Sequence, residues 1–207
     1  MLVNPMTFSQ GGGESPVVST GLVIREKNDG TPQEPKTFVY QNDISASSSA
    51  DFTCEVCGDV SGLPSGQTWG YNLAFGSGGT STNVIISVSL ASADIPTGGE
   101  WGLLVTINGY DYRTSAVLLF DTKYTITLKM SSGTLSVYVN GTALPDTITE
   151  SFNYSGNKVG VYRRNDTYTN SDRTVNGEWN EFRIYNRALT DAEILANYNA
   201  DTANYGT

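Results

Sequence analysis

The chain of 207 residues contains no histidine, and this absence limits the chemistry that it can perform. Nucleophiles activated by histidine, as in Ser-His-Asp or Cys-His catalysis, are excluded within the chain, and so is a zinc site with an imidazole ligand. Carboxylates remain as the only ordinary general acids or bases near neutral pH. Any catalysis would therefore depend on aspartate and glutamate.

Positive charge is also scarce. The chain has 12 lysine and arginine residues against 21 aspartate and glutamate residues, so its net charge is -9 and its pI is near 4.4. Binding to a nucleic-acid backbone needs a basic patch, and the longest basic run here is Arg163-Arg164. An acidic surface also repels anionic lipid. We therefore expect neither nucleic acid nor a lipid surface as a partner.

Long hydrophobic runs are missing as well. No run approaches the ~20 apolar residues of a membrane span, so we expect no membrane insertion. Residues 1–16 lack the basic and apolar regions of a secretory signal, so a cleaved signal is not expected. Gly11-Gly12-Gly13 predicts that residues 1–16 form a flexible arm. Because no break in composition divides residues 17–207, we expect them to form a single domain.

Cysteine is limited to Cys54 and Cys57, which form a single C-x-x-C pair. The segment from Phe52 to Val56 alternates like a strand, which places the two thiols on opposite faces. A disulfide between them is then not expected, and one isolated C-x-x-C is a poor zinc signal. We interpret both as ordinary packing residues.

The pattern that is present has a period of two, which predicts β-strands along most of the chain. Asn108-Gly109 and Asn140-Gly141 are strong hairpin signals. Strands at regular spacing predict an all-β fold, an antiparallel β-sandwich or barrel. The clearest alternating segments are 69–75, 86–90, 101–107, 124–130 and 135–139.

One short C-terminal stretch is predicted to be helical. Thr190 is a plausible N-cap, and Asp191 and Glu193 fall in the first turn. The apolar face expected for this helix consists of Ile194, Leu195 and Tyr198, and we expect it to cover an end of a sheet with help from Leu189.

Three segments of the second half carry a resemblance to a known family. They are LSVYVNG at 135–141, GEWNEFRIYN at 177–186 and RALTDAEILANY at 187–198. Together they resemble the laminin-G-like, concanavalin A-like lectin family, closely over about residues 120–200 and more loosely over 38–120. The resemblance implies a jelly roll of two curved antiparallel sheets that binds sugars or proteins at a concave face or a loop rim. Asn180 stands where the family usually has aspartate, which weighs against a calcium ion at that position.

Carboxylate spacing argues against hydrolysis. Glycosidases of this fold place acids at alternate positions of one strand, so that two of them flank the bond. Here Glu178 and Glu181 are three apart, hence on opposite faces, and Asp51 with Glu55 lacks a third acid. Glu181 and Arg183 share one face, where we expect them to pair across the sheet. We therefore predict no enzyme and no catalytic residue, with a glycoside hydrolase as the less favoured alternative.

Binding is predicted at two mixtures of aromatic and polar residues, which suit sugar rings and hydroxyls. One follows the first hairpin: Tyr110, Asp111, Tyr112 and Arg113. The other is the long loop 163–177, with ligand candidates Arg163, Asn165 and Tyr168. A plain solvated loop is the alternative for this segment. No cofactor is required; calcium is the one ion considered, through Asp166 and Asp172.

These observations favour a non-catalytic, lectin-like or adhesion module displayed on a bacterial surface or a phage particle. Its expected partner is a glycan or a cell-surface or virion protein, and its expected location is extracellular. The alternative is a structural or decoration protein of a virion or cell surface without a sugar site, which the Gly-rich arm would also suit.

Overall fold

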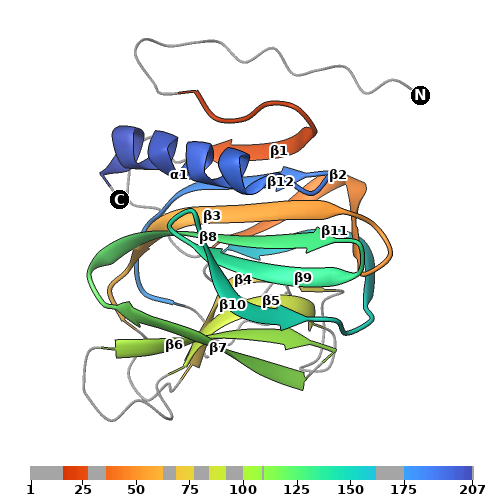
Figure 1. Cartoon of the computed structure of the whole chain (residues 1–207), viewed down its shortest axis with the longest axis horizontal. Coiled ribbons are helices and arrows are strands. Elements are labelled where there is room, and N and C mark those ends of the chain that lie inside the picture. The colour runs from red at the N-terminus through yellow and green to blue at the C-terminus, as the bar shows by residue number, and fades with distance from the viewer. Residues whose placement is uncertain are drawn as a thin grey trace.

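The computed structural model of the chain consists of two six-stranded antiparallel sheets that pack face to face, with one helix on the outside (Figure 1). It describes residues 16–27, 36–62, 69–76, 84–91, 100–108, 110–161 and 175–206. The sheet that we call sheet A has the strand order β1-β12-β3-β8-β9-β10, and sheet B has the order β2-β11-β4-β5-β6-β7. The prediction of an all-β antiparallel sandwich with one C-terminal helix is confirmed.

The strands of both sheets are 6 to 12 residues long. Sheet A contains β1 Leu22–Lys27, β12 Trp179–Tyr185, β3 Phe52–Val60, β8 Thr122–Ser131, β9 Thr134–Val139 and β10 Thr142–Ile148. Sheet B contains β2 Lys36–Ser47, β11 Asn153–Val161, β4 Trp69–Gly76, β5 Val84–Ala91, β6 Glu100–Ile107 and β7 Tyr110–Leu119. The helix α1 spans Asp191–Tyr205.

The predicted hairpins are present, and their turn residues have the backbone that such turns need. Asn140 and Gly141 join β9 to β10 with φ values of 52° and 75°, and Asn108 at the β6–β7 turn has φ 50°. A tight turn between strands requires positive φ, which asparagine and glycine tolerate better than other residues. A side chain at position 141 would also come within 3.0 Å of Leu195 on α1, so glycine lets the hairpin tip approach the helix.

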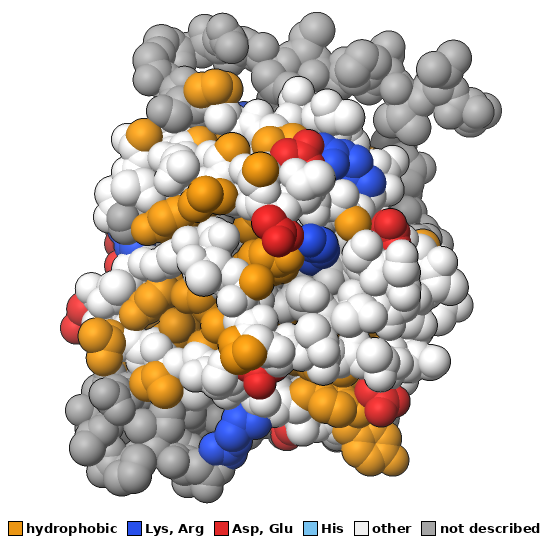
Figure 2. All heavy atoms as spheres, in the orientation of Figure 1, with side chains coloured by type: hydrophobic (Ala, Val, Ile, Leu, Met, Phe, Trp, Pro, Cys, Tyr) orange, Lys and Arg blue, Asp and Glu red, His pale blue; other side chains and the backbone are white. Residues whose placement is uncertain are grey.

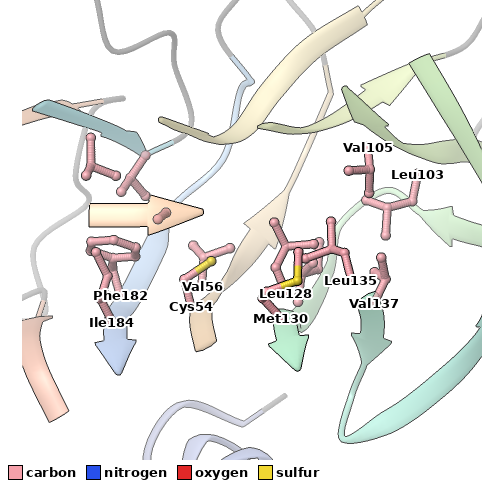
Figure 3. Packing of buried hydrophobic residues seen from close by; sticks show 14 of the residues in the cluster. Cys54, Val56, Leu103, Val105, Leu128, Met130, Leu135, Val137, Phe182 and Ile184 are labelled. Carbon is pink, nitrogen blue, oxygen red and sulfur yellow. The ribbon is translucent and has the colours of Figure 1, made fainter. Parts of the chain in front are cut away.

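The core lies between the two sheets and is built from the inward-facing positions of alternating strands. Phe182, Val56, Leu128 and Val137 point from four adjacent strands of sheet A toward Leu103 and Val105 of sheet B (Figure 3). All six of these side chains are buried, at 1% exposure or less. Burial of this apolar surface is the main force that holds the sheets together.

The two cysteines point to opposite faces of β3, as predicted. Cys54 belongs to the core, whereas Cys57 lies on the outer face of sheet A, and both are free thiols with no exposed surface. Burial raises the pKa of both thiols well above its usual range. Because the thiolate is the reactive form, both are expected to be unreactive in the folded chain.

Helix α1 lies on the outer face of sheet A, on the side opposite to the core (Figures 1 and 3). Its predicted start is confirmed: Thr190 is the N-cap, and Thr190 and Glu193 form a capping box. Gly206 ends the helix in a left-handed conformation. In the described part of the chain, no helix has the length and apolar character needed to cross a membrane.

The predicted apolar face of α1 is partly wrong. Ile194 is buried, but Leu195 is 46% exposed and Tyr198 is only half-buried. The buried face also includes Asn197, Ala200 and Asp201, two of which are polar. The helix covers the face of sheet A rather than its end, and that face carries charged side chains that polar residues must meet.

Candidate functional site

The β6–β7 hairpin positions the first predicted binding stretch at one end of sheet B. Tyr110 opposes Ile107 across the turn, Asp111 opposes Thr106, and Arg113 opposes Leu104. Because strand β7 is at the edge of the sheet, one of its sides has no neighbouring strand within sheet B.

The structure separates the four predicted residues of this stretch onto two surfaces, and their role in ligand binding stays a prediction. Asp111 and Arg113 are exposed on the outer face of sheet B, where the hydroxyl of Thr106 donates to Asp111 at 2.6 Å. Tyr112 is half-buried and packs against the margin of the core. The reason is the strand itself, since successive side chains of β7 point to opposite faces.

Tyr110, Tyr112 and Glu150 form a group that we call the tyrosine rim, between the β6–β7 turn and the segment joining β10 to β11. Tyr110 is 72% exposed, which is unusual for a large aromatic side chain in the described structure. Glu150 is exposed and accepts a hydrogen bond from the hydroxyl of Tyr112. Burial and then this bond raise the pKa of Tyr112, so its hydroxyl remains a donor across the neutral range. The rim thus presents an aromatic ring beside a carboxylate and a phenol.

The backbone around the tyrosine rim is fixed by contacts to neighbouring elements. The amide Nδ2 of Asn108 donates to the carbonyl of Ser151 at 2.9 Å, which joins the hairpin tip to the segment that carries Glu150. Further along β7, the backbone N–H and the hydroxyl of Ser115 both donate to Asp146 of β10 at 2.7 Å. These bonds lower the pKa of Asp146 and tie the edge strand of sheet B to that of sheet A.

The far end of β7 presents apolar side chains on the outer face of sheet B. Val117 is 55% exposed and Leu119 is 53% exposed, and they alternate with buried Ala116 and Leu118. Val117 opposes Gly102 of β6, so the neighbouring strand places no side chain beside Val117. The outer face therefore changes from polar near Asp111 to apolar near Leu119.

The second predicted binding segment cannot be compared with the structure. Arg163, Asn165 and Tyr168, and the calcium candidates Asp166 and Asp172, lie outside the described residues. Within the described residues, no group of three or more histidine, cysteine, aspartate or glutamate side chains could hold a metal ion. The calcium prediction at Asp166 and Asp172 stays a prediction.

Beneath α1 the structure assembles a charged cluster that was only partly expected. We call it the α1 network; it consists of Arg25, Glu55, Glu181, Arg183 and Asp201. Arg183 Nη2 lies 2.5 Å from Asp201 of the helix, and its Nε lies 3.0 Å from Glu55 of β3. Glu181 and Arg183 do pair across the sheet, Glu181 with Arg25 of β1 at 2.5 Å, and they also lie 3.4 Å from each other.

The α1 network is closed to solvent, so it cannot act on a dissolved substrate. The side chains of Glu55, Glu181, Arg183 and Asp201 have no exposed surface, and that of Arg25 is 13% exposed. In the sequence, the spacing of Asn197 and Asp201 by four residues is the signal that could have revealed a polar face of the helix.

Solved structures of other proteins share this fold. Trypanosoma rangeli sialidase in complex with 2,3-difluorosialic acid is 16% identical, with a TM-score of 0.60 over 95% of this chain and 35% of that chain. A heptameric SAP-like pentraxin from Limulus polyphemus is 14% identical, with a TM-score of 0.58 over 86% and 82%. A Bacteroides ovatus protein that is considered to bind carbohydrate is 18% identical, with a TM-score of 0.53 over 80% and 47%.

The chain spans 23% to 35% of the sialidase chains that it resembles. No curated protein sequence matches it. The profile of one family matches residues 42–195, which are most of the chain. This range includes strands β3 to β12, part of β2 and the start of α1. The chain therefore belongs to the concanavalin A-like lectin/glucanases superfamily.

Proposed function

We propose that this chain is a non-catalytic carbohydrate-binding module that holds a glycan at the tyrosine rim. The observation that carries the proposal is the exposure of Tyr110 beside the hydrogen-bonded pair Tyr112–Glu150. An exposed aromatic ring offers a stacking surface for a sugar ring, while a phenol and a carboxylate offer partners for its hydroxyls. The chain also belongs to a superfamily that includes lectins, which supports carbohydrate binding.

The state of the carboxylates supports binding without catalysis. Most glycosidases use two carboxyl groups that flank the glycosidic bond. Glu55, Glu181 and Asp201 are enclosed beneath α1 and each contacts an arginine. At the tyrosine rim, Glu150 accepts a hydrogen bond from the hydroxyl of Tyr112. The tyrosine rim therefore lacks the carboxylate pair that this common mechanism uses.

The charge distribution favours a glycan that carries hydroxyls rather than acidic groups. The chain has a net charge of -9, and the charged member of the rim is an acid. On the side of the molecule shown in Figure 2, acidic and basic side chains lie singly or beside one another, scattered among uncharged ones. A polymer of like charge would be repelled. We propose that the module works outside the cell, on a bacterial surface or a phage particle, with a neutral glycan as its partner and no required cofactor.

A second function, docking to another protein of a cell surface or virion, is favoured by one observation. Val117 and Leu119 expose apolar surface side by side on the outer face of β7. Exposed apolar residues that gather in one patch are typical of contact surfaces. This would give the module a structural or decoration role without a sugar site.

A glycan array tests the proposed function, with the unmodified chain compared to Tyr110→Ala. Loss of the stacking surface is expected to weaken binding about tenfold, which corresponds to roughly 1.4 kcal/mol. Tyr198→Ala, at a half-buried tyrosine on α1, serves as the matched control and should leave binding unchanged. Release of reducing sugar from any bound glycan, or equal binding by Tyr110→Ala, contradicts the proposal.

A further inference from the structure

The α1 network contains more acidic groups than basic groups. Three carboxylates, from Glu55, Glu181 and Asp201, meet two guanidinium groups, from Arg25 and Arg183. With every group ionised, the enclosed cluster carries one negative charge in excess. An excess charge buried away from water is costly, and a carboxylate relieves it by keeping its proton.

Contacts differ among the three carboxylates and indicate which one keeps the proton. Asp201 accepts two hydrogen bonds from Arg183, at 2.9 and 2.5 Å, and one from Thr125. Glu181 accepts hydrogen bonds from Arg25, Arg183 and the hydroxyl of Tyr205. Both are therefore held by charged donors, which favour the ionised form.

Glu55 is the least compensated of the three. Its hydrogen bonds come from neutral donors, the amide of Asn197 at 2.7 Å and the hydroxyl of Thr127 at 3.2 Å. The Nε atom of Arg183 lies 3.0 Å from Glu55, yet its N–H makes no hydrogen bond. Attraction without a hydrogen bond compensates only part of the cost of burying the charge.

Every element packed against Glu55 contributes to its surroundings. Groups that face it or lie within the same layer include Cys57 on β3, Thr125 and Thr127 on β8, Tyr138 on β9, Glu181, Arg183 and Tyr185 on β12, Arg25 on β1, and Asn197, Asp201 and Tyr205 on α1. Two lysines also lie on this outer face: Lys27 of β1 opposes Glu181, and Lys129 of β8 pairs with Asp191 of α1.

We propose that α1 is held on sheet A by a proton-dependent latch, in which Glu55 is protonated while the helix is docked and ionises when the helix leaves the sheet. Docking is then strongest in mild acid and weakens as the pH rises through neutrality. The latch includes Asn197, Asp201 and Tyr205, which lie beyond residue 195 where the family match ends.

The pKa shifts of the buried carboxyl groups agree with docking that weakens as the pH rises. Burial raises the pKa of Glu55 to about 7, from an ordinary value of 4.5. Burial raises the pKa of Asp201 as well, whereas charge pairing keeps the pKa of Glu181 below its usual range. A carboxyl whose pKa is raised in the docked state stabilises that state below its pKa. That stabilisation is lost as the pH rises from about 4.5 to about 7.

The latch also reaches the N-terminal side of the structure. The backbone N–H of Val18 donates to the side-chain oxygen of Asn197 at 2.7 Å, and the hydroxyl of Tyr185 donates to the carbonyl of Val18. Release of α1 therefore removes a partner from the segment that leads into β1. Undocking would expose the polar outer face of sheet A, including Thr125 and Thr127.

Hydrogen exchange of the α1 amides, expressed as protection factors to remove the intrinsic pH dependence, tests the latch on the full chain. From linkage, protection is expected to fall about tenfold between pH 6 and pH 8. Glu55→Gln, which cannot ionise, should show equal protection at the two pH values. Glu193→Gln, an acid of the same helix outside the network, should keep the tenfold change.

Equal protection of unmodified α1 at pH 6 and pH 8 overturns the proposal, and so does a pH dependence that persists in Glu55→Gln. An infrared measurement gives an answer even if Glu55→Gln does not fold. The unmodified chain should show a band from a protonated, buried carboxylic acid that disappears between pH 6 and pH 8. Absence of such a band at pH 6 overturns the proposal as well.

Discussion

Arg183 of β12 and Asp201 of α1 form an ion pair at 2.5 Å that solvent does not reach, and this pair joins the second half of the helix to sheet A. Neither side chain has any exposed surface. A buried ion pair contributes little over a well-packed apolar pair, but removal of one partner leaves an uncompensated charge. The ion pair therefore adds little net stability to the docked helix, but removal of either partner is expected to destabilise it strongly.

Replacement of Arg183 by methionine is expected to lower the free energy of unfolding by about 3 to 5 kcal/mol, because three carboxylates then lie buried beside a single arginine. Urea denaturation measures the change. Lys129→Met is the matched control: it removes a pair with Asp191, whose side chain is 72% exposed, and should cost about 1 kcal/mol or less. Equal losses in the two variants would contradict this account of the network.

The reactivity of Cys57 is expected to measure opening of α1, whereas that of Cys54 is expected to measure opening of the core. Cys57 lies beneath α1 and Cys54 lies between the sheets, so opening of the helix exposes Cys57 first. With Cys54→Ser, a thiol reagent at pH 8 should label Cys57 at the rate of helix opening. With Cys57→Ser, labelling of Cys54 should require global unfolding and be much slower. Equal rates would show that helix and sheet open together.

Much of the fold could be predicted from local patterns. The turn at Asn140-Gly141 and the N-cap at Thr190 were both predicted, because each depends on a few adjacent residues. Strand β2, which extends from Lys36 to Ser47, is not among the clearest alternating segments of the sequence. Its second half, QNDISAS, alternates only at Ile44 and Ala46, and pairing with β11 extends the strand to Ser47. Long-range pairing of this kind is not visible in a short window of sequence.

The site was less accessible to prediction, for two physical reasons. Period-two alternation already implies that Tyr112 and Arg113 face opposite ways, so the predicted stretch could have been divided from sequence. By contrast, the contact of Tyr112 with Glu150 joins segments 38 residues apart and depends on how the sheets pack. The same applies to Glu55 and Asp201, whose meeting requires that α1 dock on this face of sheet A.

Gly177 is expected to contribute strongly to the stability of the fold. It has φ 145°, and a Cβ atom there would lie 2.2 Å from the backbone oxygen of Asp59. The close approach is maintained by hydrogen bonds between Asp59 and Glu178, including the N–H of Glu178 to the Asp59 carboxylate at 2.5 Å. Gly177→Ala should therefore destabilise the chain by about 3 kcal/mol or more.

Gly206→Ala provides the control for Gly177, because Gly206 also has positive φ, at 70°, but nothing lies within 4 Å of its Cβ position. Backbone strain alone should cost about 1 kcal/mol there. Thermal denaturation of the two variants separates strain from steric overlap. A similar small loss in both would mean that the strand end at Asp59 moves aside.

The two surfaces of the β6–β7 hairpin can be distinguished by paired substitutions. If a glycan binds at the tyrosine rim, Tyr110→Ala should weaken binding about tenfold while Arg113→Ala, on the outer face of sheet B, leaves it unchanged. Glu150→Gln retains an acceptor for Tyr112 and should weaken binding by a smaller factor. Isothermal titration with the best array ligand measures all three. Loss of binding in Arg113→Ala with normal binding in Tyr110→Ala would move the site to the outer face, where Val117 and Leu119 then supply its apolar part.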